Sequence, residues 1–196
     1  MIIWINGAFG AGKTQTAYEL HRRLPDSFVY DPENAGYFIR KNVPKRIALG
    51  DFQDYPMWRD TNYAMLKHLD SEYDSVVIAP MTLVHPGYFD EIVGRLREDG
   101  VPVRHFALCA GKETLLKRLR GRGEGSESWA AAQIDRCVAA LSDEKFAYHL
   151  DTEGHSVADN AERIAELAGL ALQPDERSRM RKAYDRIRTQ IRHIRF

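Results

Sequence analysis

A phosphate-binding pattern lies close to the start of the sequence. Residues Gly7 to Thr14 read GAFGAGKT, which fits the pattern G-x-x-x-x-G-K-T. In this pattern the glycines let backbone N–H groups turn toward phosphate oxygens, and the following helix adds the partial positive charge of its N-terminus. Lys13 is expected to neutralise the β- and γ-phosphates, and Thr14 to offer its hydroxyl to Mg²⁺. The spacing predicts a nucleotide-binding loop; the alternative is a glycine-rich turn that holds only a structural anion.

The rest of the chain favours a small-molecule kinase over other users of such a loop. The N-K-x-D signature of switch GTPases is absent from the sequence. The apolar run SVVIAP ends without the Walker B aspartate of an ATPase motor, and Pro80 and Thr82 stand near its end. We expect ATP and Mg²⁺ as cofactors, with Thr14 as the magnesium ligand. The residues expected to bind the nucleotide are Gly7, Gly10, Ala11, Gly12, Lys13, Thr14, Gln15, Arg118, Arg136 and Asp151.

Four side chains are expected to serve phosphoryl transfer: Lys13, Asp31, Arg118 and Arg122. Asp31 ends the apolar run SFVYD, and a carboxylate at the end of a parallel strand can accept the proton of an attacking hydroxyl. Arg118 lies just before the glycine-rich stretch GRGEGSES, Arg122 at its start, and Arg136 after it. Arginines on a closing lid stabilise charge on a transferring phosphoryl group. The alternatives are that Asp31 caps a turn and that the arginines are solvated.

An acceptor pocket is expected in residues 32–73, between the second and third strands. This segment is longer than a crossover requires and is rich in aromatic residues and arginine. Such a surface can stack a ring and hold an anionic or sugar group; the alternative is that the aromatic residues form the core of two helices. The expected substrate contacts are Phe9, Asp31, Arg40, Phe52, Trp58, Arg59 and Thr82.

Alternating strands and helices predict an α/β fold with a five-stranded parallel sheet between two helix layers. Strands are expected at 1–6, 27–31, 74–80, 101–110 and 144–152, and helices at 14–24, 55–69, 86–100, 112–123 and 156–169. The last helix begins with Ser156 and has Asp159 three residues on, a capping-box-like start. We expect a P-loop kinase-like domain over 1–173 with a small lid at about 119–132, followed by a separate segment at 174–196.

The composition sets limits on partners and location. The chain has 196 residues, with 28 Lys and Arg against 28 Asp and Glu, so we expect no nucleic-acid partner. Its two cysteines exclude a disulfide framework, and neither a signal peptide nor a membrane-spanning run is expected. The expected location is the cytoplasm or a membrane surface, and the expected partner is a small-molecule substrate.

The segment 174–196 carries its own charge and pattern. It holds eight basic and three acidic residues, so its net charge is 8 − 3 = +5. Apolar residues recur at helical spacing and form a stripe of Met180, Tyr184, Ile187, Ile191 and Ile194. We expect an amphipathic helix that docks on the domain with a solvated basic face. A second role is peripheral contact of 180–196 with an anionic membrane.

Several longer strings resemble the TmrB-type tunicamycin-resistance proteins. They include MIIWINGAFGAGKTQTAYELHRRL, VYDPE, DFQDYP, PMTLVHPGYF, SWAAAQIDRCV and the closing HIRF. The resemblance covers nearly the whole chain and implies a fold similar to nucleoside monophosphate kinases and small antibiotic phosphotransferases. It also implies resistance to tunicamycin, a uracil-nucleoside antibiotic, and association with membranes.

The resemblance carries over Gly7, Gly12, Lys13 and Thr14, whereas Asp31 and the lid arginines come from the wider kinase pattern. The implied function is ATP-dependent phosphoryl transfer to tunicamycin or a related uridine-containing molecule. The alternatives are ATP-dependent sequestration of the drug without turnover, and a kinase for an ordinary metabolite.

Overall fold

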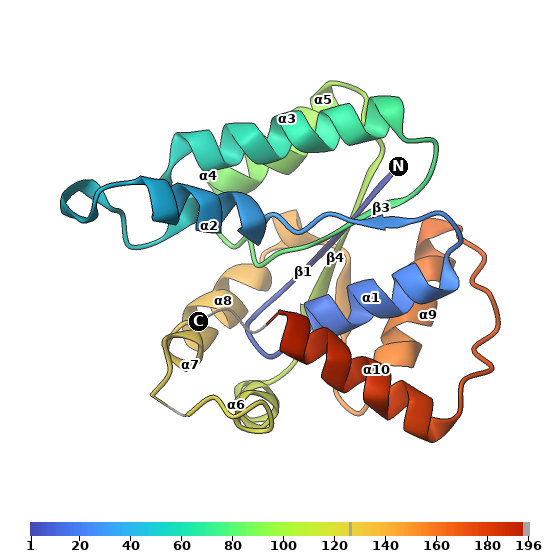
Figure 1. Ribbon diagram of the computed structural model, residues 1–196. Coiled ribbons are helices and arrows are strands. Elements are labelled where there is room, and N and C mark those ends of the chain that lie inside the picture. The colour runs from blue at the N-terminus through green and yellow to red at the C-terminus, as the bar shows by residue number, and fades with distance from the viewer. Residues whose placement is uncertain (126, 194–196) are drawn as a thin grey trace.

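The computed structural model describes residues 1–125 and 127–193, and it confirms the α/β class and the five-stranded parallel sheet (Figure 1). The strand order is β2-β3-β1-β4-β5. The strands are β1 (Ile2–Gly7), β2 (Phe28–Val29), β3 (Val77–Pro80), β4 (Val103–Cys109) and β5 (His149–Asp151). Because parallel strands end at the same edge, the residues that follow β1, β2 and β3 meet there.

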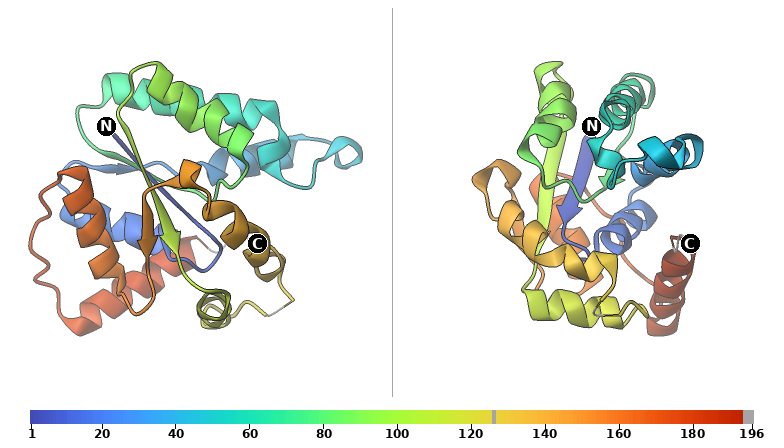
Figure 2. Two further views of the ribbon diagram at one scale, coloured as in Figure 1. Left: turned by 180° about the vertical axis from the view of Figure 1, so that it is seen from behind. Right: turned by 90° about the vertical axis from the view of Figure 1, so that its left-hand side faces the viewer.

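The central strand β1 explains why the sheet is covered on both faces. All six of its residues are buried. It pairs with β3 and β4, so that Trp4 lies opposite Ala79 on one side and His105 on the other. A nearly continuous apolar strand of this kind is stable only when helices shield both faces. Figure 2 shows this arrangement, with α1 and α10 on one side of the sheet and α8 on the other.

The helices follow the predicted alternation, with additions. The longer ones are α1 (Lys13–Arg23), α2 (Glu33–Asn42), α3 (Pro56–Glu72), α6 (Lys112–Arg120), α8 (Ile134–Leu141), α9 (Val157–Ala168) and α10 (Arg179–Arg192). The short ones are η1 (Lys45–Ile47), η2 (Phe52–Asp54), α4 (Pro86–Phe89), α5 (Arg95–Glu98), α7 (Trp129–Ala132) and η4 (Glu144–Phe146). The capping box of α9 at Ser156 and Asp159 is confirmed. No helix among the described residues is long and apolar enough to cross a membrane.

Three expected elements differ in the structure. The strand expected at 144–152 begins with η4 instead, because the Asp143 carboxylate accepts the N–H of Lys145 and starts a 3-10 turn. The strand expected at 27–31 is reduced to the two residues of β2 at the sheet edge. The helix expected at 86–100 ends at Glu98 and contains a π-helical segment, η3 (Asp90–Gly94), between α4 and α5.

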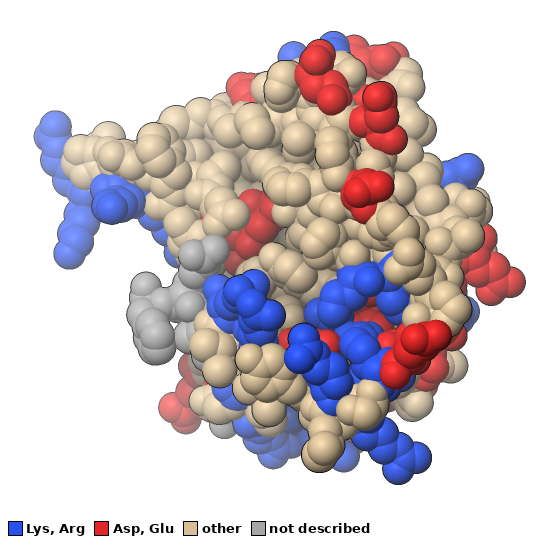
Figure 3. Space-filling view, turned by 45° about the vertical axis from the view of Figure 1, so that its right-hand side comes forward, with Lys and Arg blue, Asp and Glu red and all other residues tan. Residues whose placement is uncertain are grey.

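The C-terminal helix docks on α1, but with the opposite face from the expected one. The inward residues of α10 are Asp185 and Thr189, whereas the apolar stripe is exposed, with Met180 at 82% and Ile191 at 63%. Arg177 lies just before the helix and pairs with Glu19 of α1, Asp175 and Asp185. This ion cluster draws the polar face inward, and Figure 3 shows basic and acidic side chains gathered where α10 lies. The last stripe residue, Ile194, lies outside the described residues.

Candidate nucleotide and acceptor site

The phosphate loop connects β1 to α1 and has the backbone that an anion cradle needs. Its glycines Gly7, Gly10 and Gly12 have φ values of 147°, 84° and 97°. Gly10 also lies tightly against α6, because a Cβ there would stand 2.8 Å from the carbonyl oxygen of Leu115. The first turn of α1 begins at Lys13, directly after Gly12. The loop therefore combines left-handed glycines with a helix N-terminus, the arrangement that binds phosphate.

Lys13 folds back across this loop. Its Nζ donates hydrogen bonds to the carbonyl oxygens of Gly7 at 3.0 Å and Ala8 at 3.1 Å. Burial lowers the pKa of Lys13 to about 8, and the negative charge of Glu33 acts in the opposite direction. A phosphate bound here would stabilise the charged form of this partly desolvated ammonium group, because its negative charge would replace the lost hydration.

Thr82 and Asn6 hold the loop from the sheet side. The Thr82 hydroxyl donates to the carbonyl oxygen of Gly7 at 2.8 Å. Asn6 Oδ1 accepts the N–H groups of Gly7 and Leu83 at 2.8 and 3.0 Å, and its Nδ2 donates to the Leu83 carbonyl at 2.7 Å. Asn6 Nδ2 also lies 3.1 Å from Nε2 of His105, whose Nδ1 lies 3.0 Å from the Ala147 carbonyl. These bonds tie the loop to the residues that follow β3 and to the middle of β4.

The charge of His105 fits this network. Burial lowers its pKa to about 4, so the ring is neutral at ordinary pH. With Nδ1 protonated and donating to Ala147, Nε2 is left to accept from Asn6. The ring therefore acts as a fixed acceptor beneath the phosphate loop.

The phosphate loop opens into a cleft of about 670 Å³, which we call the phosphate cleft. Its lining includes Lys13, Thr14, Gln15, Asp31 and Arg122. Asp31 follows β2, and its Oδ1 accepts the N–H of Glu33 at 3.0 Å, which fixes the carboxylate at the start of α2. Burial lowers the pKa of Arg122, and Arg122 in turn lowers that of Lys13, so the two cations face the same space.

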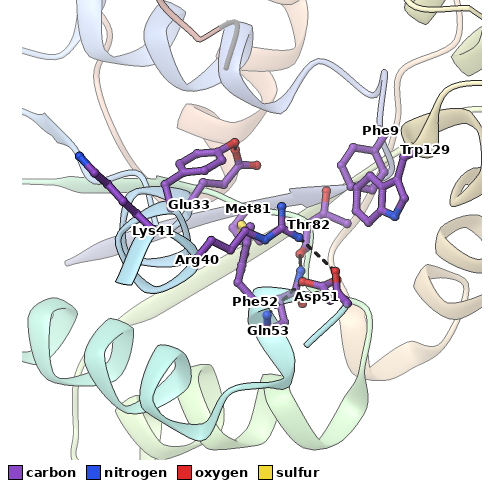
Figure 4. A pocket seen from close by; sticks show the side chains of 12 residues that line it. Phe9, Glu33, Arg40, Lys41, Asp51, Phe52, Gln53, Met81, Thr82 and Trp129 are labelled. Carbon is purple, nitrogen blue, oxygen red and sulfur yellow. Dashed lines mark hydrogen bonds between the residues drawn. The ribbon is translucent and has the colours of Figure 1, made fainter. Parts of the chain in front are cut away.

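A second cleft of about 750 Å³ adjoins it, and we call it the aromatic cleft (Figure 4). The two clefts share Phe9, Glu33, Tyr37 and Trp129. The rings of Phe9 and Trp129 meet edge to face with centroids 5.1 Å apart. The aromatic cleft is also lined by Arg40, Lys41, Gly50, Asp51, Phe52, Gln53, Met81 and Thr82. A molecule in the aromatic cleft would contact aromatic rings and charged side chains of both signs, and it would lie next to the phosphate cleft.

These residues fit the cofactors that the loop implies. The glycine backbone, the N-terminus of α1 and Lys13 suit the phosphates of ATP, and the hydroxyl of Thr14 and the carboxylate of Asp31 line the same cleft as hard oxygen donors. Among the described residues, no group of three His, Cys, Asp or Glu side chains is placed to hold a metal by itself. Magnesium at this site would therefore depend on phosphate oxygens, Thr14 and water.

Some predicted site residues lie elsewhere. Arg118 donates to the hydroxyl and carbonyl of Thr152 at 3.0 and 2.8 Å, which turns it toward the loop after β5. Arg136 and Asp151 are exposed and do not line either cleft.

Two of the predicted substrate contacts are also outside the clefts. Trp58 is fully buried beneath Phe52, with ring centroids 5.4 Å apart, and its Nε1 donates to the Pro32 carbonyl. Arg59 is buried and pairs with Glu91. Phe9, Arg40, Phe52 and Thr82 line the aromatic cleft, and their role as substrate contacts stays a prediction.

Eight residues that line the aromatic cleft are not among the predicted site residues: Glu33, Tyr37, Lys41, Gly50, Asp51, Gln53, Met81 and Trp129. Glu33 had a signal, because it lies two residues after Asp31 and Asp-x-Glu at a strand end puts two carboxylates near one edge. Trp129 also had one, since it directly follows the glycine-rich stretch that was expected to close over the site.

A phosphate loop at the edge of a five-stranded parallel sheet, with a second cleft beside it, defines a P-loop protein of the kinase-like α/β class. The AAA domain family matches residues 2–146. The structure is also similar to that of the tunicamycin resistance protein of Deinococcus radiodurans, with 37% identity over 89% of this chain and 98% of that chain and a TM-score of 0.77. The chain belongs to the AAA domain family and, within that class, to the family of tunicamycin-resistance proteins, as the resemblance predicted.

More distant similarities concern the fold alone. A gluconokinase from Sinorhizobium meliloti is 18% identical over 85% of this chain and 93% of its own, with a TM-score of 0.61. A shikimate kinase from Bacteroides thetaiotaomicron is 18% identical over 87% of this chain and 99% of its own, with a TM-score of 0.57. A search of curated protein sequences found no match.

Proposed function

We propose that the protein is an ATP- and Mg²⁺-dependent phosphotransferase that acts on tunicamycin or a related uridine-containing small molecule and so confers resistance. The observation that carries this proposal is the continuity of the two clefts through Phe9, Glu33, Tyr37 and Trp129. A nucleotide held by the phosphate loop would direct its terminal phosphate toward a molecule in the aromatic cleft. The family relationship to the Deinococcus protein supports the choice of drug.

The residues divide the work between binding and proton transfer. Lys13 and the loop amides hold the phosphates, and Mg²⁺ supplies further charge neutralisation there when it is bound. Arg122 lines the phosphate cleft and would stabilise negative charge on the phosphoryl group in the transition state. Asp31 orients the acceptor hydroxyl and takes its proton. Phe9 and Trp129 pack against the acceptor and exclude water from the junction of the clefts.

Mass spectrometry of tunicamycin after incubation with the protein and MgATP tests the proposal. A mass gain of one phosphoryl group is expected with the wild-type protein and not with Lys13→Ala. Asp31→Asn is the sharper variant, because an asparagine oxygen can still accept the N–H of Glu33 while the charge is lost. It should bind nucleotide normally and transfer phosphate at least a hundredfold more slowly. Asp135→Asn, at an exposed ion pair with Lys112, is the matched control.

The second candidate is ATP-dependent sequestration of the drug at a membrane surface in the cytoplasm, and the outward apolar stripe of α10 favours it. Tyr184, Ile187 and Ile191 are more than half exposed, and arginines flank them. Such a face matches an anionic bilayer. Unmodified drug that co-purifies with the protein and ATP would support this candidate over phosphoryl transfer.

Membrane contact can be tested separately with vesicles of phosphatidylglycerol and phosphatidylcholine. Ile187→Ser should reduce co-sedimentation severalfold. Leu167→Ser on α9, which changes another exposed apolar residue, should leave it unaltered. Equal co-sedimentation of both variants with the wild-type protein would remove α10 from any membrane role.

A further inference from the structure

The last turn of α10 lies beside the phosphate loop. Thr189, Gln190 and His193 line the phosphate cleft together with Lys13 and Thr14. Thr189 is 6% exposed and faces inward, whereas its helical neighbours Arg188 and Ile187 face outward. The C-terminal helix therefore forms a wall of the cleft in which the nucleotide phosphates are expected.

Two contacts fix this turn on α1. Gln15 follows Thr14 directly, and its Nε2 donates to the carbonyl oxygen of Arg186 at 2.9 Å. The ring of His193 lies against Tyr18, with centroids 5.0 Å apart. Gln15 Oε1 is buried and has no hydrogen-bond partner among the described residues. A buried amide oxygen of this kind, between the phosphate loop and α10, is suited to accept from a ligand or its water shell.

The two ends of α10 are held with different strength. At the N-terminal end, Arg177 pairs with Glu19, Asp175 and Asp185. These contacts hold the pKa of Asp175 well below its usual range, chiefly through its hydrogen bond with Arg177. Neither contact of the C-terminal end is an ion pair. The C-terminal half is thus the part whose position can respond to what fills the phosphate cleft.

We infer that the last turn of α10 belongs to the nucleotide site, with Gln190 and His193 binding the phosphate groups of a nucleoside triphosphate and the bound nucleotide fixing α10 on α1. The Gln190 amide is a suitable donor to phosphate oxygens, and His193, whose Nδ1 donates to the Thr189 carbonyl at 2.8 Å, would offer Nε2–H to them in its imidazolium form. The inference rests on the proposed function for the identity of the nucleotide. Coupling between binding events is reciprocal. A molecule that binds only when α10 is displaced from α1 would therefore weaken nucleotide binding, and the nucleotide would weaken binding of that molecule by the same factor.

Isothermal titration calorimetry with MgATP tests this in the full-length protein. The double variant Gln190→Ala/His193→Ala should bind about tenfold more weakly than wild type, because hydrogen bonds to a charged ligand are lost. Ile187→Ala is the matched control, since it shortens an outward side chain of the same helix that is 59% exposed. Its affinity should equal that of the wild-type protein.

Hydrogen exchange of the wild-type protein separates binding from folding effects. MgATP should slow exchange of the amides of residues 186–193 severalfold. Equal affinities of wild type and double variant would overturn the inference. So would weaker binding by the variant when MgATP leaves exchange at 186–193 of the wild-type protein unchanged, since the variant would then act through folding. Failure of the wild-type protein to bind MgATP at all would instead overturn the proposed function, and this inference with it.

Discussion

Replacing Lys13 with methionine is expected to stabilise the nucleotide-free protein at neutral pH while abolishing nucleotide binding. Burial lowers the pKa of Lys13 from 10.5 to about 8 in the folded protein. This lowering of the pKa corresponds to roughly 3 kcal/mol of unfavourable charging of the buried ammonium group. The variant loses the bonds from Nζ to Gly7 and Ala8, which offsets part of this gain. We expect a net increase in the free energy of unfolding of about 1–2 kcal/mol.

The pH dependence distinguishes this cause from a packing effect. Because the folded-state pKa is lower than the unfolded one, the unfavourable charging is fully present below pH 8. It disappears between pH 8 and 10.5, as the folded protein loses the proton before the unfolded chain does. The advantage of Lys13→Met should therefore shrink across that range.

Urea unfolding at several pH values measures this difference. Lys117→Met, which changes an exposed lysine of α6, is the control and should alter stability by less than about 0.5 kcal/mol. A Lys13→Met protein that is no more stable than wild type at neutral pH would refute the reasoning. So would an advantage that stays constant up to pH 10.5.

Three further predictions concern the supports of the site. Thr82→Val should lower stability by about 1–2 kcal/mol and weaken MgATP binding in calorimetry, because it removes the 2.8 Å bond to the Gly7 carbonyl. His105→Gln should reduce the loss of stability at acid pH in urea titrations. The wild-type protein should lose up to roughly 3 kcal/mol from pH 6.5 to 4, because the His105 ring stays neutral in the folded protein, with a pKa of about 4, while the unfolded chain takes up a proton. Arg177→Met should leave three carboxylates without their shared partner and release α10, seen as faster proteolysis after residue 174. Because Glu19, Asp175 and Asp185 keep Arg22, Lys182 and Arg181 as second partners, the expected loss of stability is about 1–3 kcal/mol. An unchanged proteolysis pattern for Arg177→Met, or the same loss of stability at acid pH for His105→Gln as for the wild-type protein, would contradict these accounts.

The phosphate loop was readable from the sequence because its chemistry is local. The glycines, Lys13 and the first turn of α1 are contiguous, so spacing alone specifies their geometry. The sheet was also predictable, since buried parallel strands read as apolar runs. The 3-10 turn at η4 was not, because apolar and polar residues are mixed along 144–152 and the Asp143 cap decides the backbone at its start.

The aromatic cleft depends on tertiary contacts that no single segment reveals. Phe52 and Trp58 are both aromatic, yet one lines the aromatic cleft and the other lies beneath it. Arg118 and Arg122 are four residues apart in the sequence, but Arg118 lies on α6 and bonds to Thr152, whereas Arg122 follows the helix and lines the phosphate cleft. The periodicity of the C-terminal helix identified its apolar stripe correctly. It could not say which face turns inward, because Arg177, outside the helix, decides that.

Both N–H groups and the oxygen of the Asn6 side-chain amide are occupied by hydrogen bonds. Its amide nitrogen serves the Leu83 carbonyl and His105, and its oxygen serves the N–H groups of Gly7 and Leu83. Aspartate has no donor for the first pair of partners, and leucine has neither donor nor acceptor, so each would leave several buried groups without partners. Positions 6 and 105 should therefore change together among homologues, and an unpaired change at position 6 should mark a chain whose phosphate loop is held in another way.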